Sequence, residues 1–169
     1  MTRTQPSLRF CASCGGRLSR RRVAGRSRSV CRSCGQIAYE NAKPCAGALV
    51  VRDGNVLLVK RGVTPYRGWW DIPGGYLEAD EHPEAGARRE LREETGLRVR
   101  LRGLLGVYVD RQIRPHSLNF YYLAEVSGGR ERASDDAVEL GWFGPGELPA
   151  RIAFPGHAKA VLADWRRRV

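Results

Sequence analysis

Two Cys-x-x-Cys pairs near the N-terminus constrain the fold of this chain most strongly. Cys11 and Cys14 form the first pair, Cys31 and Cys34 form the second, and sixteen residues lie between the pairs. Four thiols at this spacing are typical of a tetrahedral zinc site, and four thiolate ligands leave no open position for water or substrate. A glycine follows each pair and allows a tight backbone turn. The pattern predicts a small ribbon around a structural zinc ion.

Two disulfide bonds are the alternative interpretation of the four cysteines. Residues 1–10 hold no apolar stretch typical of a secretory signal, which favours a reducing compartment and the zinc interpretation. Cys45, the fifth cysteine, starts an apolar run and is interpreted as a small buried thiol. We expect a cytoplasmic protein that does not enter the membrane.

Positive charge is concentrated in the same N-terminal region. The net charge is +11, but residues 1–44 hold ten Lys or Arg against Glu40 alone, a net +9. The remainder holds nineteen basic and seventeen acidic residues, a net +2. This uneven distribution predicts a boundary near residue 44, with a ribbon over 1–44 and a second domain over 45–169.

The basic loop between the cysteine pairs, Arg17–Arg32, has the charge needed to contact phosphates of RNA or DNA. The sequence has no aromatic residue between Phe10 and Tyr39 that could stack on bases, which argues against a dedicated single-strand binder. A solvated basic loop is therefore an equal alternative to a nucleic-acid contact.

The second region alternates apolar runs with turn residues. Residues 46–52 and 56–60 flank Asp53-Gly54-Asn55 and predict a β-hairpin. Further strand-like runs cover 99–109, 118–126 and 138–143, whereas helices are predicted from about Pro83 to Gly96 and over 155–168. Strands mixed with two helices indicate a layered α/β or α+β domain.

The first of these helices carries an unusual set of acidic residues. Glu90, Glu93 and Glu94 stand at i, i+3 and i+4, so their side chains share one helix face, where like charges repel unless a cation is present. Mg²⁺ binds a few carboxylates together with water and phosphate oxygens, so this face suits a metal shared with a diphosphate. Neutralisation by neighbouring arginines on a solvated helix is the alternative.

Two glycine positions favour the functional interpretation. Gly74-Gly75 gives a loop that can approach a phosphate closely or present a carbonyl to a metal. Gly86 lies within the helix, where glycine costs about 1 kcal/mol relative to alanine, so we expect a close contact at this position. Locally unfavourable residues that coincide in this way are typical of functional sites.

The segment from Gly75 to Leu97 resembles the Nudix box: Gly, five residues, Glu, seven residues, Arg-Glu, an aliphatic residue, any residue, Glu-Glu, any residue, Gly and an aliphatic residue. Every specified position is filled without an insertion, by Gly75, Glu81, Arg89, Glu90, Leu91, Glu93, Glu94, Gly96 and Leu97. The resemblance implies a Nudix-type α/β/α sandwich with a mixed sheet, preceded by the small zinc ribbon.

The same resemblance implies roles for individual residues. Hydrolysis of a nucleoside diphosphate linked to another group would use Mg²⁺ or Mn²⁺ at Glu90, Glu93 and Glu94, one of which is the base. Arg89 and Glu81 would form an ion pair that orients the helix. The expected further metal ligands are the carbonyl of Gly74 and the carboxylate of Glu139, and the expected substrate contacts are Gly75, Trp70 and Tyr76.

The implied substrate is a small nucleotide. Zinc-ribbon Nudix proteins include NADH pyrophosphatases and enzymes that act on ADP-ribose or FAD, and this chain lacks the Trp and proline run of the former group in residues 110–120. ADP-ribose-like or FAD-like substrates are therefore preferred, with NADH or NAD and oxidised nucleotides as alternatives. A nucleic-acid-binding regulator that only senses a nucleotide is the non-enzymatic alternative. The resemblance also allows a homodimer.

Overall fold

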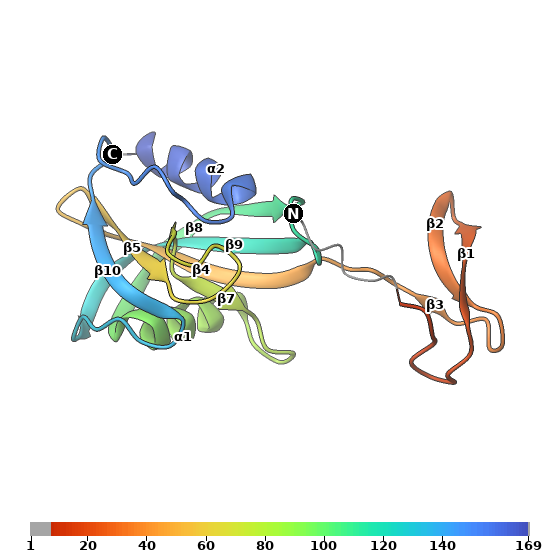
Figure 1. Cartoon of the computed structure of the whole chain (residues 1–169). Helices are drawn as coiled ribbons and strands as arrows, with labels where there is room; N and C mark the ends of the chain where they lie inside the picture. The colour runs from red at the N-terminus through yellow and green to blue at the C-terminus, as the bar shows by residue number, and fades with distance from the viewer. Residues whose placement is uncertain (1–7, 169) are drawn as a thin grey trace. The chain divides into compact units, whose positions relative to one another are not determined.

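The computed structural model of the chain (Figure 1) describes residues 8–168. Packing divides it into two compact units. One extends to Ala42 and includes Ile113–Pro115, and the other comprises Lys43–Gln112 and the chain from His116 onward. This division by contacts lies near the change of charge at residue 44. Within the described residues, no helix is long and apolar enough to cross a bilayer.

The smaller unit, here called the ribbon, contains an antiparallel three-stranded sheet. Its strands are β1 (Leu18–Val23), β2 (Arg26–Cys31) and β3 (Ile37–Ala38), in the order β1-β2-β3. Ala24 and Gly25 connect β1 to β2 with φ angles of 47° and 74°, as a two-residue hairpin turn requires. Both Cys-x-x-Cys pairs lie at the same end of this sheet, because Cys14 shortly precedes Leu18, the first residue of β1, and Leu18 lies opposite Cys31, the last residue of β2.

The larger unit is built on a seven-stranded mixed sheet. Its central order is β10-β5-β4-β9-β8, with β6 paired to β5 and β7 paired to β4. Only β4 and β9 run parallel among these described pairs. The strands are β4 (Lys43–Arg52), β5 (Asn55–Arg61), β6 (Trp70–Asp71), β7 (Gly74–Tyr76), β8 (Leu97–Asp110), β9 (Ser117–Gly129) and β10 (Ala137–Phe143).

The predicted hairpin is confirmed as the connection between β4 and β5. Arg52 pairs with Asn55, so Asn55 belongs to the strand and the turn consists of Asp53 and Gly54 alone. Both turn residues have positive φ, 50° and 75°, which matches the right-handed twist of the flanking strands.

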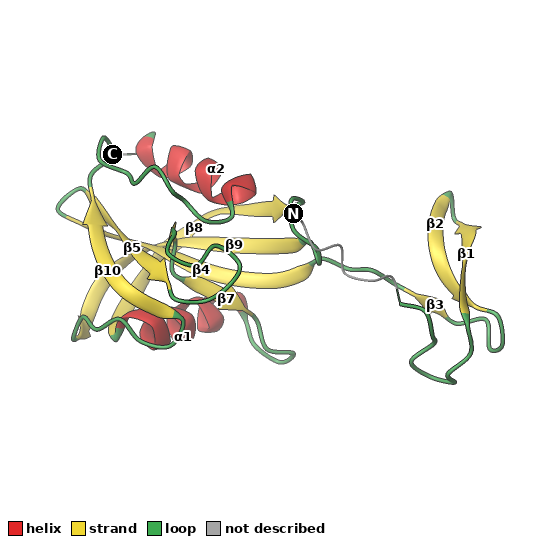
Figure 2. Cartoon of the chain, in the orientation of Figure 1, coloured by secondary structure: helices red, strands yellow, loops and turns green. Residues whose placement is uncertain are grey.

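Two helices cover opposite faces of the sheet, α1 (Pro83–Thr95) and α2 (Pro155–Arg166), as Figure 2 shows. Successive side chains of a strand point to opposite faces. In β4, Ala48 and Val50 accordingly pack in one cluster with Leu91 of α1, whereas Leu49 packs in another with Trp165 of α2. The expected α/β/α sandwich with a mixed sheet is confirmed.

Local signals set the ends of α1 as predicted. The imidazole of His82 accepts a hydrogen bond from the backbone N–H of Glu84 at 3.3 Å, and Pro83 fills the first helical position. At the other end Gly96 has a φ of 70° and donates its N–H to the carbonyl of Arg92. Glu90, Glu93 and Glu94 therefore lie on a helix of defined start and end.

Candidate active site

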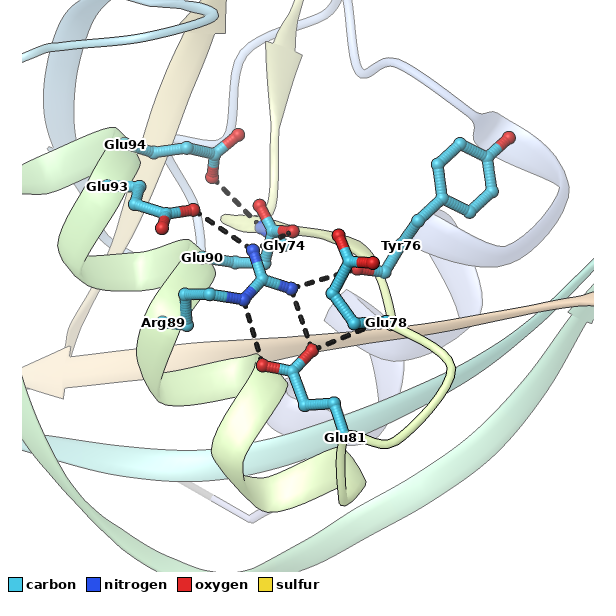
Figure 3. A network of polar contacts seen from close by, with 8 residues as sticks. All are labelled: Gly74, Tyr76, Glu78, Glu81, Arg89, Glu90, Glu93 and Glu94. Atoms are coloured by element: carbon cyan, nitrogen blue, oxygen red, sulfur yellow. Dashed lines mark hydrogen bonds and ion pairs between the residues drawn. The ribbon is translucent and has the colours of Figure 1, made fainter.

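Glu94 connects α1 to the Gly74-Gly75 segment. Its carboxylate is almost fully buried, and Oε2 accepts a hydrogen bond of 3.0 Å from the backbone N–H of Gly74 in β7 (Figure 3). Because β7 pairs with β4, this bond fixes the carboxylate against the centre of the sheet. The glutamate is therefore directed inward rather than toward bulk solvent.

Arg89 lies at the centre of the polar network in Figure 3. Its Nε and Nη2 donate to the two oxygens of Glu81, each at 2.8 Å, in a bidentate pair. Nη1 donates to Glu90 at 2.8 Å and to Glu93 at 3.0 Å, while Nη2 also donates to the carbonyl of Tyr76 at 3.0 Å. Arg89 thus connects the segment before α1, through Tyr76 and Glu81, to Glu90 and Glu93 of the helix.

Burial and mutual repulsion act on the acidic groups. Burial raises the pKa of Glu94 well above its usual range, and the nearby carboxylates of Asp71 and Glu90 raise it further. Burial also raises the pKa of Glu90, against the influence of Arg89. The hydrogen bonds from Arg89, in contrast, lower the pKa of Glu81. The surroundings therefore disfavour the ionised forms of Glu90 and Glu94 and favour the ionised form of Glu81.

Two glycines of the box, Gly75 and Gly86, lie close to carboxylates. A Cβ on Gly75 would lie 2.5 Å from the carboxyl carbon of Glu90, so a larger residue there would displace this carboxylate from its present position. A Cβ on Gly86 would collide with the side chain of Leu77 and lie 2.9 Å from Oε2 of Glu81. The close contact predicted from a glycine inside α1 is confirmed.

The structure does not join Glu139 to the box glutamates. Lys60 of β5 donates to Glu139 Oε2 at 2.7 Å, and these residues lie opposite each other in the β10–β5 ladder. Directly opposite residues point to the same face of a sheet. Within β5, every second side chain points to one face, so Lys60 shares a face with Val56 and Leu58, which pack under α2. Glu139 therefore lies on the face opposite α1, and the metal role expected for it has no geometric support.

The expected aromatic contacts are also separated from the carboxylates. Trp70 packs edge-on against Phe143, with ring centroids 4.8 Å apart, and belongs to the core under α2. Tyr76 contributes its carbonyl to Arg89, while its exposed ring points away from the carboxylates in Figure 3. The arrangement makes Trp70 part of the core and leaves the ring of Tyr76 free at the edge of the site.

Two acidic residues of this region were not identified from the sequence. Asp71, buried in β6, forms an ion pair of 3.2 Å with Arg61 and raises the pKa of Glu94. Asp135, in the loop before β10, is close enough to raise the pKa of Glu90. Neither residue belongs to the box, and their strand and loop positions give no periodic signal, so only the tertiary structure reveals them.

The four cysteines of the ribbon converge. Their sulfurs all lie within 4.8 Å of one another, and within the described residues no other group of three or more His, Cys, Asp or Glu side chains meets this criterion. The sulfur–sulfur distances Cys11–Cys34, Cys14–Cys31 and Cys14–Cys34 are 3.8, 3.5 and 3.4 Å, too long for a disulfide bond. Gly15 and Gly35 have φ angles of 70° and 74°, as the predicted tight turns require. Cys45 is half-buried rather than fully buried.

The fold and the site are those of a known class of protein. The NUDIX domain family matches residues 42–164, and the family described as Nudix N-terminal, a zinc ribbon, matches residues 9–40. This chain belongs to the Nudix hydrolase family. A solved NUDIX hydrolase from Nitrosomonas europaea is 32% identical, with a TM-score of 0.82 and coverage of 95% of this chain and 92% of that one.

Two curated relatives have more specific names. An ADP-ribose pyrophosphatase from Methanocaldococcus jannaschii is 38% identical over 131 residues, which is 76% of either protein. A NAD-capped RNA hydrolase NudC from Chromobacterium violaceum is 33% identical over 144 residues, 85% of this chain. The match spans only 52% of that hydrolase, about half of its length.

Proposed function

We propose that this chain hydrolyses the pyrophosphate bond of a nucleoside diphosphate linked to a second group, with an ADP-ribose-like molecule as the preferred substrate. The observation that carries the proposal is the pair of buried or half-buried carboxylates, Glu90 and Glu94, held beside the Gly74-Gly75 segment. Hydrolysis would release a nucleoside monophosphate.

The donor set fits a divalent cation. Glu90 and Glu94 are hard oxygen ligands with pKa values raised by burial, so a bound cation would stabilise their ionised forms. Glu93 has 41% of its side chain exposed, against 14% for Glu90, and faces the open side of the network. The Gly74 carbonyl is the proposed backbone ligand. Mg²⁺ or Mn²⁺ in this site would neutralise phosphate oxygens and lower the pKa of a bound water.

Arg89 is proposed as a positioning residue for this site. Its Nη1 is shared between Glu90 and Glu93, whereas its other two donor nitrogens bind Glu81. Glu90 and Glu93 can therefore exchange their shared Nη1 contact for a cation without loss of the bidentate Arg89–Glu81 pair. That pair would keep the start of α1 and the Glu81 loop in place while one of the box glutamates accepts a proton from the attacking water.

A NAD-type dinucleotide is a second candidate substrate. The NudC relative, 33% identical, supports it, although residues 110–120 lack the Trp and proline run expected of NADH pyrophosphatases. The two candidates share an adenosine diphosphate moiety, so the pyrophosphate site serves both. For the ribbon we propose a structural Zn²⁺ bound by Cys11, Cys14, Cys31 and Cys34.

A substrate panel tests the proposal. ADP-ribose, FAD, NAD, NADH and oxidised dGTP are assayed with Mg²⁺ and with Mn²⁺, and products are identified by mass. We expect AMP from ADP-ribose, a loss of about 100-fold or more in kcat for Glu94→Gln, and near wild-type kcat for the control Glu139→Gln. Full activity of Glu94→Gln, or no turnover of any dinucleotide at saturating metal, would refute the proposed reaction.

A further inference from the structure

The ribbon has an excess of positive charge that its own residues do not neutralise. Glu40 is the only acidic residue among the first 44, and its carboxylate lies 3.6 Å from Arg20. Within residues 8–42, no acidic side chain forms an ion pair with Arg9, Arg17 or Arg21. A surface of this kind attracts polyanions and releases counterions when it binds them.

The strand register places two positive charges directly opposite each other. Arg21 in β1 lies directly opposite Arg28 in β2. Like charges in a cross-strand pair destabilise a sheet, so this pairing costs the ribbon stability. An anionic partner on the sheet would remove that cost.

A pocket of about 180 Å³ lies on the ribbon beside this sheet. Its lining residues include three arginines, two serines and one aromatic residue, which are Arg9, Arg17, Arg20, Ser19, Ser29 and Phe10. Arg20 is already held by Ser27 and Ser29, at 3.1 and 3.3 Å, which leaves Arg9 and Arg17 to contact a ligand. Guanidinium and hydroxyl donors around one concavity suit a phosphate group.

Two exposed aromatic rings lie beside arginines of the ribbon. Phe10 forms a β-bridge with Arg17 and remains 55% exposed. Tyr39 is 59% exposed, and the guanidinium carbon of Arg28 lies 4.7 Å from the centre of its ring. The sequence places both rings outside the basic loop, which argued against base stacking, but the fold places Phe10 beside Arg17 and Tyr39 beside Arg28. Arg28 pairs with Arg21, on the face opposite to the Arg20–Ser29 pair, so of these two rings Phe10 is the one that lines the pocket. Exposed aromatic rings next to cationic groups are the elements of single-strand recognition.

We infer that the ribbon is a docking surface for a single-stranded nucleic acid. The ribbon pocket takes a backbone phosphate at Arg9 and Arg17, and the ring of Phe10 stacks on the adjacent base. The inference goes beyond the proposed hydrolysis and does not depend on it, because all of these residues lie in the ribbon.

Fluorescence anisotropy with the full zinc-loaded chain tests the inference. The probe is a labelled oligoadenylate RNA of about twelve nucleotides, within the range of single-strand site sizes. In Arg9→Gln/Arg17→Gln, the slope of log K against log salt should become shallower by about 1.4, at about 0.7 per lost phosphate contact. The matched control Arg100→Gln/Arg130→Gln removes two exposed arginines of the larger unit and should keep the wild-type slope. Arg9→Lys/Arg17→Lys should also keep it, because the charge remains.

A second pair of variants tests the stacking. Phe10→Ala should weaken binding about fivefold or more, whereas Leu8→Ala, an exposed apolar neighbour in the same pocket wall, should leave it unchanged. Zinc content equal to that of the wild type shows that each variant is folded. An unchanged salt slope in the double glutamine variant, or equally tight binding of double-stranded RNA with no effect of Phe10→Ala, would overturn the inference.

Discussion

The guanidinium of Arg89 and the carboxylate of Glu81 form two parallel hydrogen bonds, Nε to Oε1 and Nη2 to Oε2, both of 2.8 Å. Glu81 lies before α1 and Arg89 lies within it, so the pair fixes the entry of the chain into the helix that carries the carboxylates. A single planar group makes this geometry possible, and an ammonium group does not reproduce it.

Arg89→Lys should therefore lower both stability and turnover. We expect a loss of about 1.5–3 kcal/mol in the free energy of unfolding, measured in urea, and a fall in kcat larger than any change in KM. The control is Arg88→Lys, because Arg88 forms an exposed ion pair with Glu84, and its effect should stay below about 0.5 kcal/mol. Equal effects of the two substitutions would show that the bidentate geometry is unimportant.

Gly86→Ala should destabilise the larger unit, although alanine favours a helix by about 1 kcal/mol. The added Cβ collides with Leu77 and approaches the carboxylate of Glu81, so we expect a net loss of about 1–3 kcal/mol in thermal or urea unfolding. The reverse change at the exposed neighbouring position, Ala85→Gly, should cost only the helix propensity of about 1 kcal/mol. A more stable Gly86→Ala variant would contradict the close packing at this position.

His157 predicts a pH-dependent contribution to stability. It is buried, with Nδ1 3.0 Å from Asp110 Oδ2 and Nε2 3.1 Å from the hydroxyl of Tyr121. Burial lowers the pKa of His157 below 6.5, with Asp110 acting in the opposite direction. The unfolded chain then binds the proton more strongly, so this contribution is present above pH 6.5 and is lost as pH falls through the folded pKa.

The measurement is the difference in the free energy of unfolding between wild type and His157→Gln, determined at several pH values from 5 to 8. The difference should shrink toward acid pH. Ser127→Ala, a change of an exposed residue with no ionisable side chain, serves as the control, since it adds and removes no titrating group. A difference that grows as pH falls would show that the protonated imidazole is the stabilised form.

Cys31→Ser should remove the proposed zinc ion and unfold the ribbon, because the metal supplies the folding free energy of such small modules. We expect about one zinc per wild-type chain, clearly less in the variant, and faster amide hydrogen exchange in residues 8–42. Cys45→Ser, which lies outside the four-cysteine group, should keep the zinc. Hydrolysis of a small substrate should persist in Cys31→Ser, and its complete loss would show that the larger unit requires the ribbon.

Local features of the sequence were sufficient to predict the α1 helix and the spacing of its carboxylates. Pro83 and Gly96 act within one helical turn of their own positions, and the Glu90–Glu93–Glu94 spacing places three side chains on one face in any helix. The four-cysteine pattern and the Asp53-Gly54 turn were predicted for the same reason, because their geometry depends on neighbours in the chain.

Tertiary structure alone decided which distant residues share a surface. Pairing of β10 with β5 placed Glu139 beside Lys60, away from α1, while β6 placed Asp71 near Glu94. In the ribbon, the same kind of long-range contact placed Phe10 beside Arg17. Strand register and pairing depend on the packing of the whole sheet, since a shift of one residue reverses the face of every side chain. The sequence by itself therefore determined the helix, its caps and the ligand spacings, and only the folded sheets determined the neighbours of these groups.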